Sequence, residues 1–341
     1  MHPRRCSGSF HRPEEAFMMM MKRMAAGAAA VLALAAGTAS AQGFPVKPVR
    51  IVAPYVPGGT VDALSRALAA QLSEEFGQQV VVENRAGASG NIGAEYVAGA
   101  EPDGHVLLLT ASTVIVNPLV MKEKQRFDLH KDFTPIGMVA STPLVFVVSP
   151  QSGIATVGDF IKEAKAHPDK INFGVGGFGS GGHLAMETFN VRAGTSIPMV
   201  IYKGSAPALT DIVGGQLSAI MDPVLTTLPF VSTGRLKAIA VTGERRSALL
   251  PSVPTLGEAG VPDMDFVSWY GMWGPAGMPE AVSRRIQAGL TKVLGSPQFK
   301  AWLDKQGMVA GTVTGKQFGD YVRQESKKYG QAVADAKIEP K

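Results

Sequence analysis

The sequence has very little cysteine and, beyond its first forty residues, no long hydrophobic run. Cys6 is the only cysteine among the 341 residues. A chain without residues 1–41 would therefore have no disulfide, no thiol nucleophile and no cysteine for lipid attachment. A membrane-spanning helix needs roughly 20 consecutive apolar residues, and residues 42–341 contain no such run. We therefore expect this part of the chain to form a soluble product outside the inner membrane.

Basic runs and catalytic motifs are also missing. No cluster of Lys and Arg suggests a nucleic-acid partner. The histidines beyond the N-terminal segment do not have metal-ligand spacing; they are His105, His130, His167 and His183. Neither serine-containing glycine loop matches G-x-S-x-G, because Phe178 precedes Ser180 and Asn91 follows Ser89. We expect no metal, no cofactor and no enzyme activity.

The N-terminus has the pattern of a secretory signal peptide. Lys22 and Arg23 precede an apolar stretch over residues 24–36, and small residues follow over 38–41. A positive start, a short apolar centre and an A-x-A end are typical of such peptides. We predict cleavage near Ala41, with the residues before about position 18 arising from a mis-called start. The alternative is a permanent membrane anchor, for which the apolar stretch is short.

The remaining chain carries little net charge. Five of the 33 basic and two of the 28 acidic residues precede position 42, so the net charge falls from +5 to +2 after cleavage. A single hydrophobic core is hard to sustain in a chain as long as residues 42–341, so we expect two lobes.

Apolar runs and helical repeats alternate along the chain, which is typical of parallel sheets flanked by helices. The expected strands are residues 49–53, 80–82, 106–110, 144–148, 171–174, 199–202, 217–221 and 238–241. The expected helices are residues 61–76, 91–100, 156–166, 183–191, 279–294 and 317–335. The fold class is therefore α/β, with two lobes that are each a mainly parallel sheet flanked by helices.

Two extended segments, near residues 142–148 and 267–273, are expected to cross between the lobes. We assign residues 42–143 and 269–341 to the first lobe and residues 144–268 to the second. Two crossings create a hinge with a cleft between the lobes.

The first expected binding loop, residues 54–60, lies between a strand and a helix. Such loops open at the carboxyl edge of a parallel sheet, where ligands bind. Gly58 and Gly59 let the backbone approach a ligand, and the following helix start offers free N–H groups to an anion. Thr60 can cap the helix or donate to the ligand. Asp62 and Arg66 are four residues apart, which favours an ion pair on the helix surface.

The second expected loop, residues 174–183, has the same setting and is rich in glycine. Gly174, Gly176 and Gly179 match G-x-G-x-x-G, so a dinucleotide site is an alternative. That site also needs an acid about 20 residues further on, and residues 198–203 contain none. His183 begins the next helix, either as a structural residue or as a ligand contact. Two loops that both favour anions suggest a binding protein more than an enzyme.

Several motifs in this order and spacing resemble those of the Bug-type receptors of tripartite tricarboxylate transporters. The similarity runs from about Phe44 to the C-terminal helix. The matching stretches are residues 57–62, 83–93, 102–104, 132–135, 179–180 with 183–184, 202–208, 214–216, 251–255 with 258–260, and 275–277. Ala86, His105 and Pro223 depart from the family pattern, and Pro223 does so next to the expected pocket.

The resemblance implies a two-lobe periplasmic-binding-protein (Venus flytrap) fold that closes on a small carboxylate. It also implies delivery of that ligand to the membrane subunits of a tripartite transporter, and we expect a monomer. The pocket residues it implies are Tyr55, Gly59, Thr60, Ser89, Thr113, Phe178, Gly179, Ser180, His183 and Asp222. Asp222 would select an amino or hydroxyl group. Two alternatives stay open at this point: a sensor partner of a membrane kinase, and a dinucleotide-binding enzyme.

Overall fold

The structure is a computed structural model that describes residues 43–121, 125–335, 338 and 340. Residues 1–46 and 47–341 are separate units, and only residues 43–46 of the first are described. The predicted signal peptide and Cys6 lie outside the described residues. The second unit is compact and contains every element discussed below.

Three parallel strands begin the second unit. Strand β1 (Val49–Ala53) pairs with β2 (Val80–Asn84) on one side and with β3 (Val106–Ala111) on the other. We call β1, β2 and β3 the first set. The connecting helices are α2 (Thr60–Phe76) and α3 (Asn91–Ala98), and the prediction of a βαβαβ unit is confirmed.

Three more parallel strands form a second set. Strand β5 (Phe173–Val175) lies between β6 (Met199–Ile201) and β7 (Ala219–Pro223), and β8 (Lys237–Val241) follows later in the chain. The helices of this part are α5 (Val157–Ala166), α6 (Gly181–Ala193), α7 (Ser205–Val213) and α8 (Val224–Ser232). The strands predicted over residues 171–241 are therefore confirmed, with shifts of a few residues at their ends.

Two long strands join the two sets. Strand β4 (Phe133–Val148) pairs antiparallel with β9 (Val267–Pro275) as far as Pro143, and then with β7 and β8 from Leu144 onward. Strand β9 also pairs antiparallel with β3. The described strands thus form one ten-stranded sheet with the main order β2-β1-β3-β9-β4-β7-β5-β6. These long strands add antiparallel pairs that the sequence pattern did not predict.

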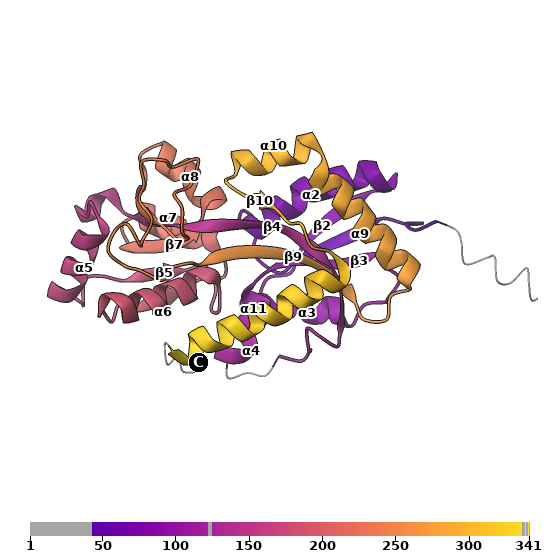
Figure 1. Cartoon of the computed structure of the whole chain (residues 1–341), viewed down its shortest axis with the longest axis horizontal. Helices are drawn as coiled ribbons and strands as arrows, with labels where there is room; N and C mark the ends of the chain where they lie inside the picture. The colour runs from indigo at the N-terminus through magenta and orange to yellow at the C-terminus, as the bar shows by residue number, and fades with distance from the viewer. Residues whose placement is uncertain (1–42, 122–124, 336–337, 339, 341) are drawn as a thin grey trace, which may run out of the picture. The chain divides into compact units, whose positions relative to one another are not determined.

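Strand β4 has apolar residues on both faces because helices cover both sides of it. Leu144, Phe146 and Val148 belong to a core that includes Phe160 of α5 and Phe189 of α6. Val145 and Val147, which alternate with them along β4, pack with residues of α7 and α8 on the opposite face. This alternation follows from the two-residue repeat of a strand. Figure 1 shows these four helices gathered around one end of β4.

The C-terminal helices return to the first set, as predicted. They are α9 (Glu280–Gly295), α10 (Pro297–Lys305) and α11 (Gly315–Asp335). Arg285 of α9 forms an ion pair with Glu75 of α2 at 3.0 Å, and Trp269 of β9 packs against Phe318 of α11. Figure 1 shows α9 and α11 beside β4 and β9. None of the helices in the described part of the chain is long and apolar enough to cross a membrane.

Candidate ligand-binding site

One cavity lies where the two sets of strands meet, and we call it the site cavity. It contains about 560 Å³ of empty space, including the part open to solvent. Its walls come from the loop after β1, the start of α4 (Thr113–Val120), the loop after β5, the start of α7, the end of β7, and strand β9. The lining residues are Tyr55, Val56, Gly59, Thr60, Val61, Ala111, Thr113, Gly176, Ser180, Gly181, Gly182, Gly204, Ser205, Asp222, Pro223, Ser268 and Tyr270.

Five helices of the described part of the chain begin at this cavity. Residues of the first turn, or the residue just before it, line the wall for α2, α4, α6, α7 and α8. The first N–H groups of a helix have no partner within the helix, and its N-terminus carries a partial positive charge. No side chain caps α2, α4, α7 or α8. The helix starts therefore favour an anion in the cavity, although its described lining contains no Lys, Arg or His.

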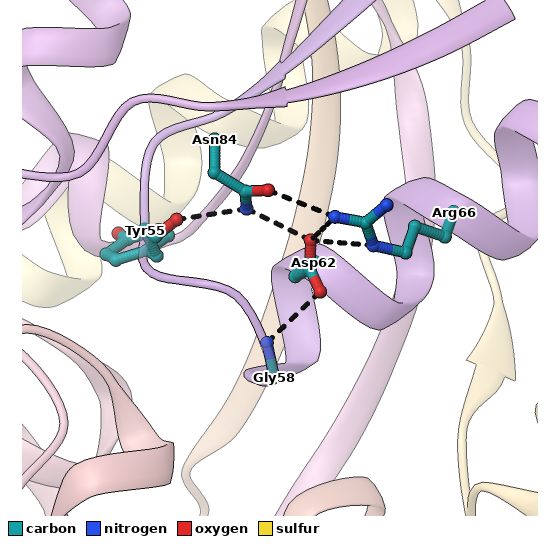
Figure 2. A network of polar contacts seen from close by, with 5 residues as sticks. All are labelled: Tyr55, Gly58, Asp62, Arg66 and Asn84. Atoms are coloured by element: carbon teal, nitrogen blue, oxygen red, sulfur yellow. Dashed lines mark hydrogen bonds and ion pairs between the residues drawn. The ribbon is translucent and has the colours of Figure 1, made fainter.

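A polar network around the buried Asp62 fixes the first loop, residues 54–60 (Figure 2). The Asp62 carboxylate accepts hydrogen bonds from the Gly58 N–H at 3.1 Å, from Arg66 Nε at 3.0 Å and from Asn84 Nδ2 at 3.0 Å. The same Asn84 amide donates to the Tyr55 carbonyl at 3.1 Å. The predicted ion pair between Asp62 and Arg66 is confirmed, and in addition it anchors the loop.

The charge of Asp62 is stable in this setting. Burial raises the pKa of Asp62, but hydrogen bonds from Arg66, Gly58 and Asn84 outweigh burial and hold the pKa below its usual value. Its carboxylate thus stays ionised at neutral pH and keeps the Gly58 N–H turned toward α2.

The second loop, residues 174–183, is held from behind by His183. Its Nδ1 accepts a hydrogen bond from the Gly179 N–H at 3.2 Å, which places the proton of a neutral imidazole on Nε2, toward Glu187 at 3.6 Å. The His183 ring also packs on Phe178, with 4.4 Å between ring centroids. The Ser180 hydroxyl caps α6 by accepting from the His183 N–H at 3.2 Å.

The ten residues predicted for the pocket fall into three groups. Six of them line the site cavity: Tyr55, Gly59, Thr60, Thr113, Ser180 and Asp222. Ser89 lines a neighbouring cavity that shares Tyr55 and Gly176 with the site cavity. Phe178, Gly179 and His183 line neither cavity and instead support the second loop.

Sequence reasoning missed several lining residues, among them Ser205, Ser268 and Tyr270. Ser205 begins a helix directly after a strand and a glycine, the same signal that identified the other two loops. Tyr270 lies on β9, and its contact with the cavity depends on long-range pairing of β9 with β3 and β4. The buried hydroxyl of Thr60 makes no hydrogen bond of good geometry, and the Tyr270 hydroxyl lies beside it.

The described part of the chain contains neither a cluster of metal ligands nor the acid that a dinucleotide site needs. There, no three His, Cys, Asp or Glu side chains gather as metal ligands would. The region after β6 contains no acid that would hold a ribose. Asp211 lies further along, within α7, and accepts a hydrogen bond from the Tyr202 hydroxyl at 2.5 Å.

Two sets of parallel strands joined by long strands, with one cavity at their helix starts, define a two-lobe periplasmic binding protein. The sequence also matches the family described as "Tripartite tricarboxylate transporter family receptor" over residues 64–338. The chain belongs to this family, which is one of solute-binding receptors, and the resemblance found in the sequence is confirmed.

Individual relatives cover nearly the whole chain. The protein BugT of Bordetella pertussis is 31% identical over 88% of this chain and 92% of its own length. The structure of R. palustris Rpa4515 with adipate has a TM-score of 0.85 at 32% identity, covering 87% of this chain and all of that one. MatC from Rhodopseudomonas palustris with bound malate has a TM-score of 0.80 at 27% identity, covering 85% of this chain and all of that one.

Proposed function

We propose that this protein is a periplasmic receptor that captures a small carboxylate in the site cavity and presents it to the membrane subunits of a tripartite transporter. Family membership supports the receptor role. Relatives with adipate and with malate support a carboxylate as the ligand.

The observation that carries the proposal is the convergence of five helix starts on a cavity that has no basic side chain among its described lining residues. A carboxylate there accepts charge-assisted hydrogen bonds from backbone N–H groups, which are about twice as strong as neutral ones. The hydroxyls of Thr60, Thr113 and Ser180 add donors that do not carry charge. Such donors recognise the carboxylate group, and the other walls of the cavity contact the rest of the ligand.

Closure of two lobes explains how binding is signalled. We assign residues 42–143 with 269–341 to one lobe and residues 144–268 to the other. The two meet at the cavity, where a Cβ on Gly58 would lie 3.7 Å from the Ala206 Cβ. A ligand that contacts both lobes favours the closed form by the difference in its affinity for the two forms. The membrane subunits would then recognise the closed form.

The proposal also covers the location of the protein, its oligomeric state and the absence of catalytic activity. We infer export through a signal peptide that is cleaved near Ala41, and a monomeric receptor without catalytic activity. Membership in a receptor family supports the location and the absence of catalytic activity.

Thermal unfolding with a panel of carboxylates tests the proposal. The protein isolated from the periplasm is mixed with mono-, di- and tricarboxylates, with their uncharged amides as controls. A ligand at 100 times its Kd adds about 2.7 kcal/mol to stability, so at least one acid should raise Tm, and above its Kd the rise should follow the logarithm of the ligand concentration. No response to any acid, or an equal response to acid and amide, would contradict the proposal.

A further inference from the structure

Among the described residues that line the site cavity, Asp222 is the only one with a charged side chain. It lies near the end of β7, just before α8, and is only 5% exposed. None of the lining residues that the structure describes is Lys, Arg or His, so no cation among them balances this carboxylate. A buried carboxylate without a counter-charge is costly, which makes its position facing a ligand cavity informative.

Two hydroxyl groups hold Asp222 in place. Ser205, the first residue of α7, donates to Oδ1 at 2.7 Å, and Thr226, in the first turn of α8, donates to Oδ2. The Asp222 carboxylate therefore already lies beside the positive ends of two of the five helices. Those two helix starts are consequently less available to a charged group of the ligand.

The hydrogen-bonding capacity of Asp222 is only partly used. An ionised carboxylate has about four acceptor positions and no donor, and the two hydroxyls occupy two of them. A ligand group in contact with Asp222 is favourable when it donates a hydrogen bond. A second carboxylate at the same place would bring two like charges together in a poorly solvated space.

We infer that the site cavity selects a carboxylate whose far end carries a hydroxyl or amino group that donates to Asp222, and that it rejects a second carboxylate there. This inference rests on the proposed function. The ligand carboxylate would lie at the starts of α2, α4 and α6, and the donor would face the starts of α7 and α8. The ligand class is thus hydroxy or amino monocarboxylates, with Asp222 as the specificity-determining residue.

Calorimetry with matched acids of equal length tests the inference. The protein isolated from the periplasm is titrated at pH 8, well above the pKa of about 6 to which burial raises Asp222. The probes are 4-hydroxybutanoate and 4-aminobutanoate against succinate, and 6-hydroxyhexanoate and 6-aminohexanoate against adipate. The Asp222→Asn variant keeps the side-chain shape without the charge. The Asp169→Asn variant, which removes one exposed acid from the turn after α5, is the matched control.

The wild-type protein should bind the hydroxy or amino acid about tenfold or more tighter than the dicarboxylate of the same length. Asp222→Asn should raise dicarboxylate affinity about tenfold and lower affinity for the amino acid, while Asp169→Asn should change neither. Equal wild-type affinity for both members of each pair overturns this inference and leaves the proposed function intact. Absence of binding by all six acids overturns this inference, and the proposed function is overturned only when no acid of the thermal-unfolding panel raises Tm either. The wild-type titrations decide the question even if Asp222→Asn fails to fold.

Discussion

Gly204 and Val56 face each other where the first loop meets the start of α7. A Cβ on Gly204 would lie 2.8 Å from Cγ2 of Val56, closer than real side chains approach. Gly204 also has a φ of 153°, a conformation that L side chains rarely adopt. The two sides of the site cavity therefore make contact here only because position 204 has no side chain.

Gly204→Ala should hold the two lobes apart. In this structure the added methyl group would meet Val56, so the arrangement in which the two lobes touch loses free energy, and ligand affinity should fall about tenfold or more. Thermal stability should fall as well, because alanine is strained at this φ. Calorimetry and thermal unfolding measure the two effects.

Gly158→Ala is the matched control, because a Cβ there would meet only Thr156 Oγ1 at 3.7 Å within α5. It should leave affinity unchanged and leave stability equal or slightly higher. Wild-type affinity in Gly204→Ala would show that this contact has no part in closure.

Asp62→Asn should loosen the first loop. The variant loses a charged acceptor for Gly58, Arg66 and Asn84, and hydrogen bonds to charged groups contribute about 1.5–3 kcal/mol. We expect lower stability at pH 7 and weaker ligand binding. Wild-type stability and wild-type affinity in Asp62→Asn would show that this carboxylate does not hold the first loop in its binding conformation.

The pH dependence of that variant follows from the direction of the pKa shift. The pKa of Asp62 is lowered in the folded protein, so its contribution is present above the unfolded value of 3.8 and is lost as pH falls through the folded value. Between pH 5 and pH 2 the wild type should therefore lose more stability than Asp62→Asn. Asp304→Asn, at an exposed position of α10, should follow the wild type.

Ser180→Ala and Thr156→Ala separate helix capping from ligand contact. Both hydroxyls cap a helix by accepting from a backbone N–H in the first turn, and loss of such a cap costs about 1 kcal/mol. Only Ser180 lines the site cavity. Both variants should lower stability by similar amounts, but only Ser180→Ala should weaken ligand binding. A similar loss of affinity in Thr156→Ala would mean that capping alone explains the effect.

Asp222 should make the ligand-free protein less stable as pH rises. Burial raises its pKa from 3.8 to about 6, against hydrogen bonds from Thr226 and Ser205. The folded state therefore binds more protons than the unfolded state in this window, and stability falls by up to about 3 kcal/mol as pH rises through it. Tyr55 and Tyr270 also line the cavity, and both stay neutral over this pH range because burial raises the pKa of each.

The Asp222→Asn variant should lack this fall. The measurement is the difference between wild-type and variant unfolding free energy at pH 4, 5, 6 and 7, because other carboxyl groups contribute equally to both proteins. A constant difference across the series would contradict a raised pKa at Asp222.

The sequence predicted most strands and helices because each has its own apolar repeat. The helix predicted to stop before Gly77 does so, with Gly77 at a φ of 65° and its N–H donating to the Ser73 carbonyl. Helices α4 and α8 were not predicted, since each contains a proline, Pro118 or Pro229, that usually signals a break. The first half of β4 was missed because its strand character depends on pairing with β9.

The site shows the same division between local and long-range information. The glycine loops were found because their local pattern, a strand followed by glycines and a helix start, is explicit in the sequence. The support given by His183 and the exposure of Tyr270 to the cavity depend on contacts that no local pattern encodes. The lobe boundaries at residues 143 and 268 stay a prediction, because residues 47–341 form one compact unit.

The most direct test of the central claim is a crystal structure of the protein in complex with the acid that raises its Tm most. The account predicts carboxylate oxygens about 3 Å from backbone nitrogens in the first turns of α2 and α6, with no basic side chain in contact. A carboxylate that faces solvent, or that pairs with a Lys or Arg outside the site cavity, would contradict the account.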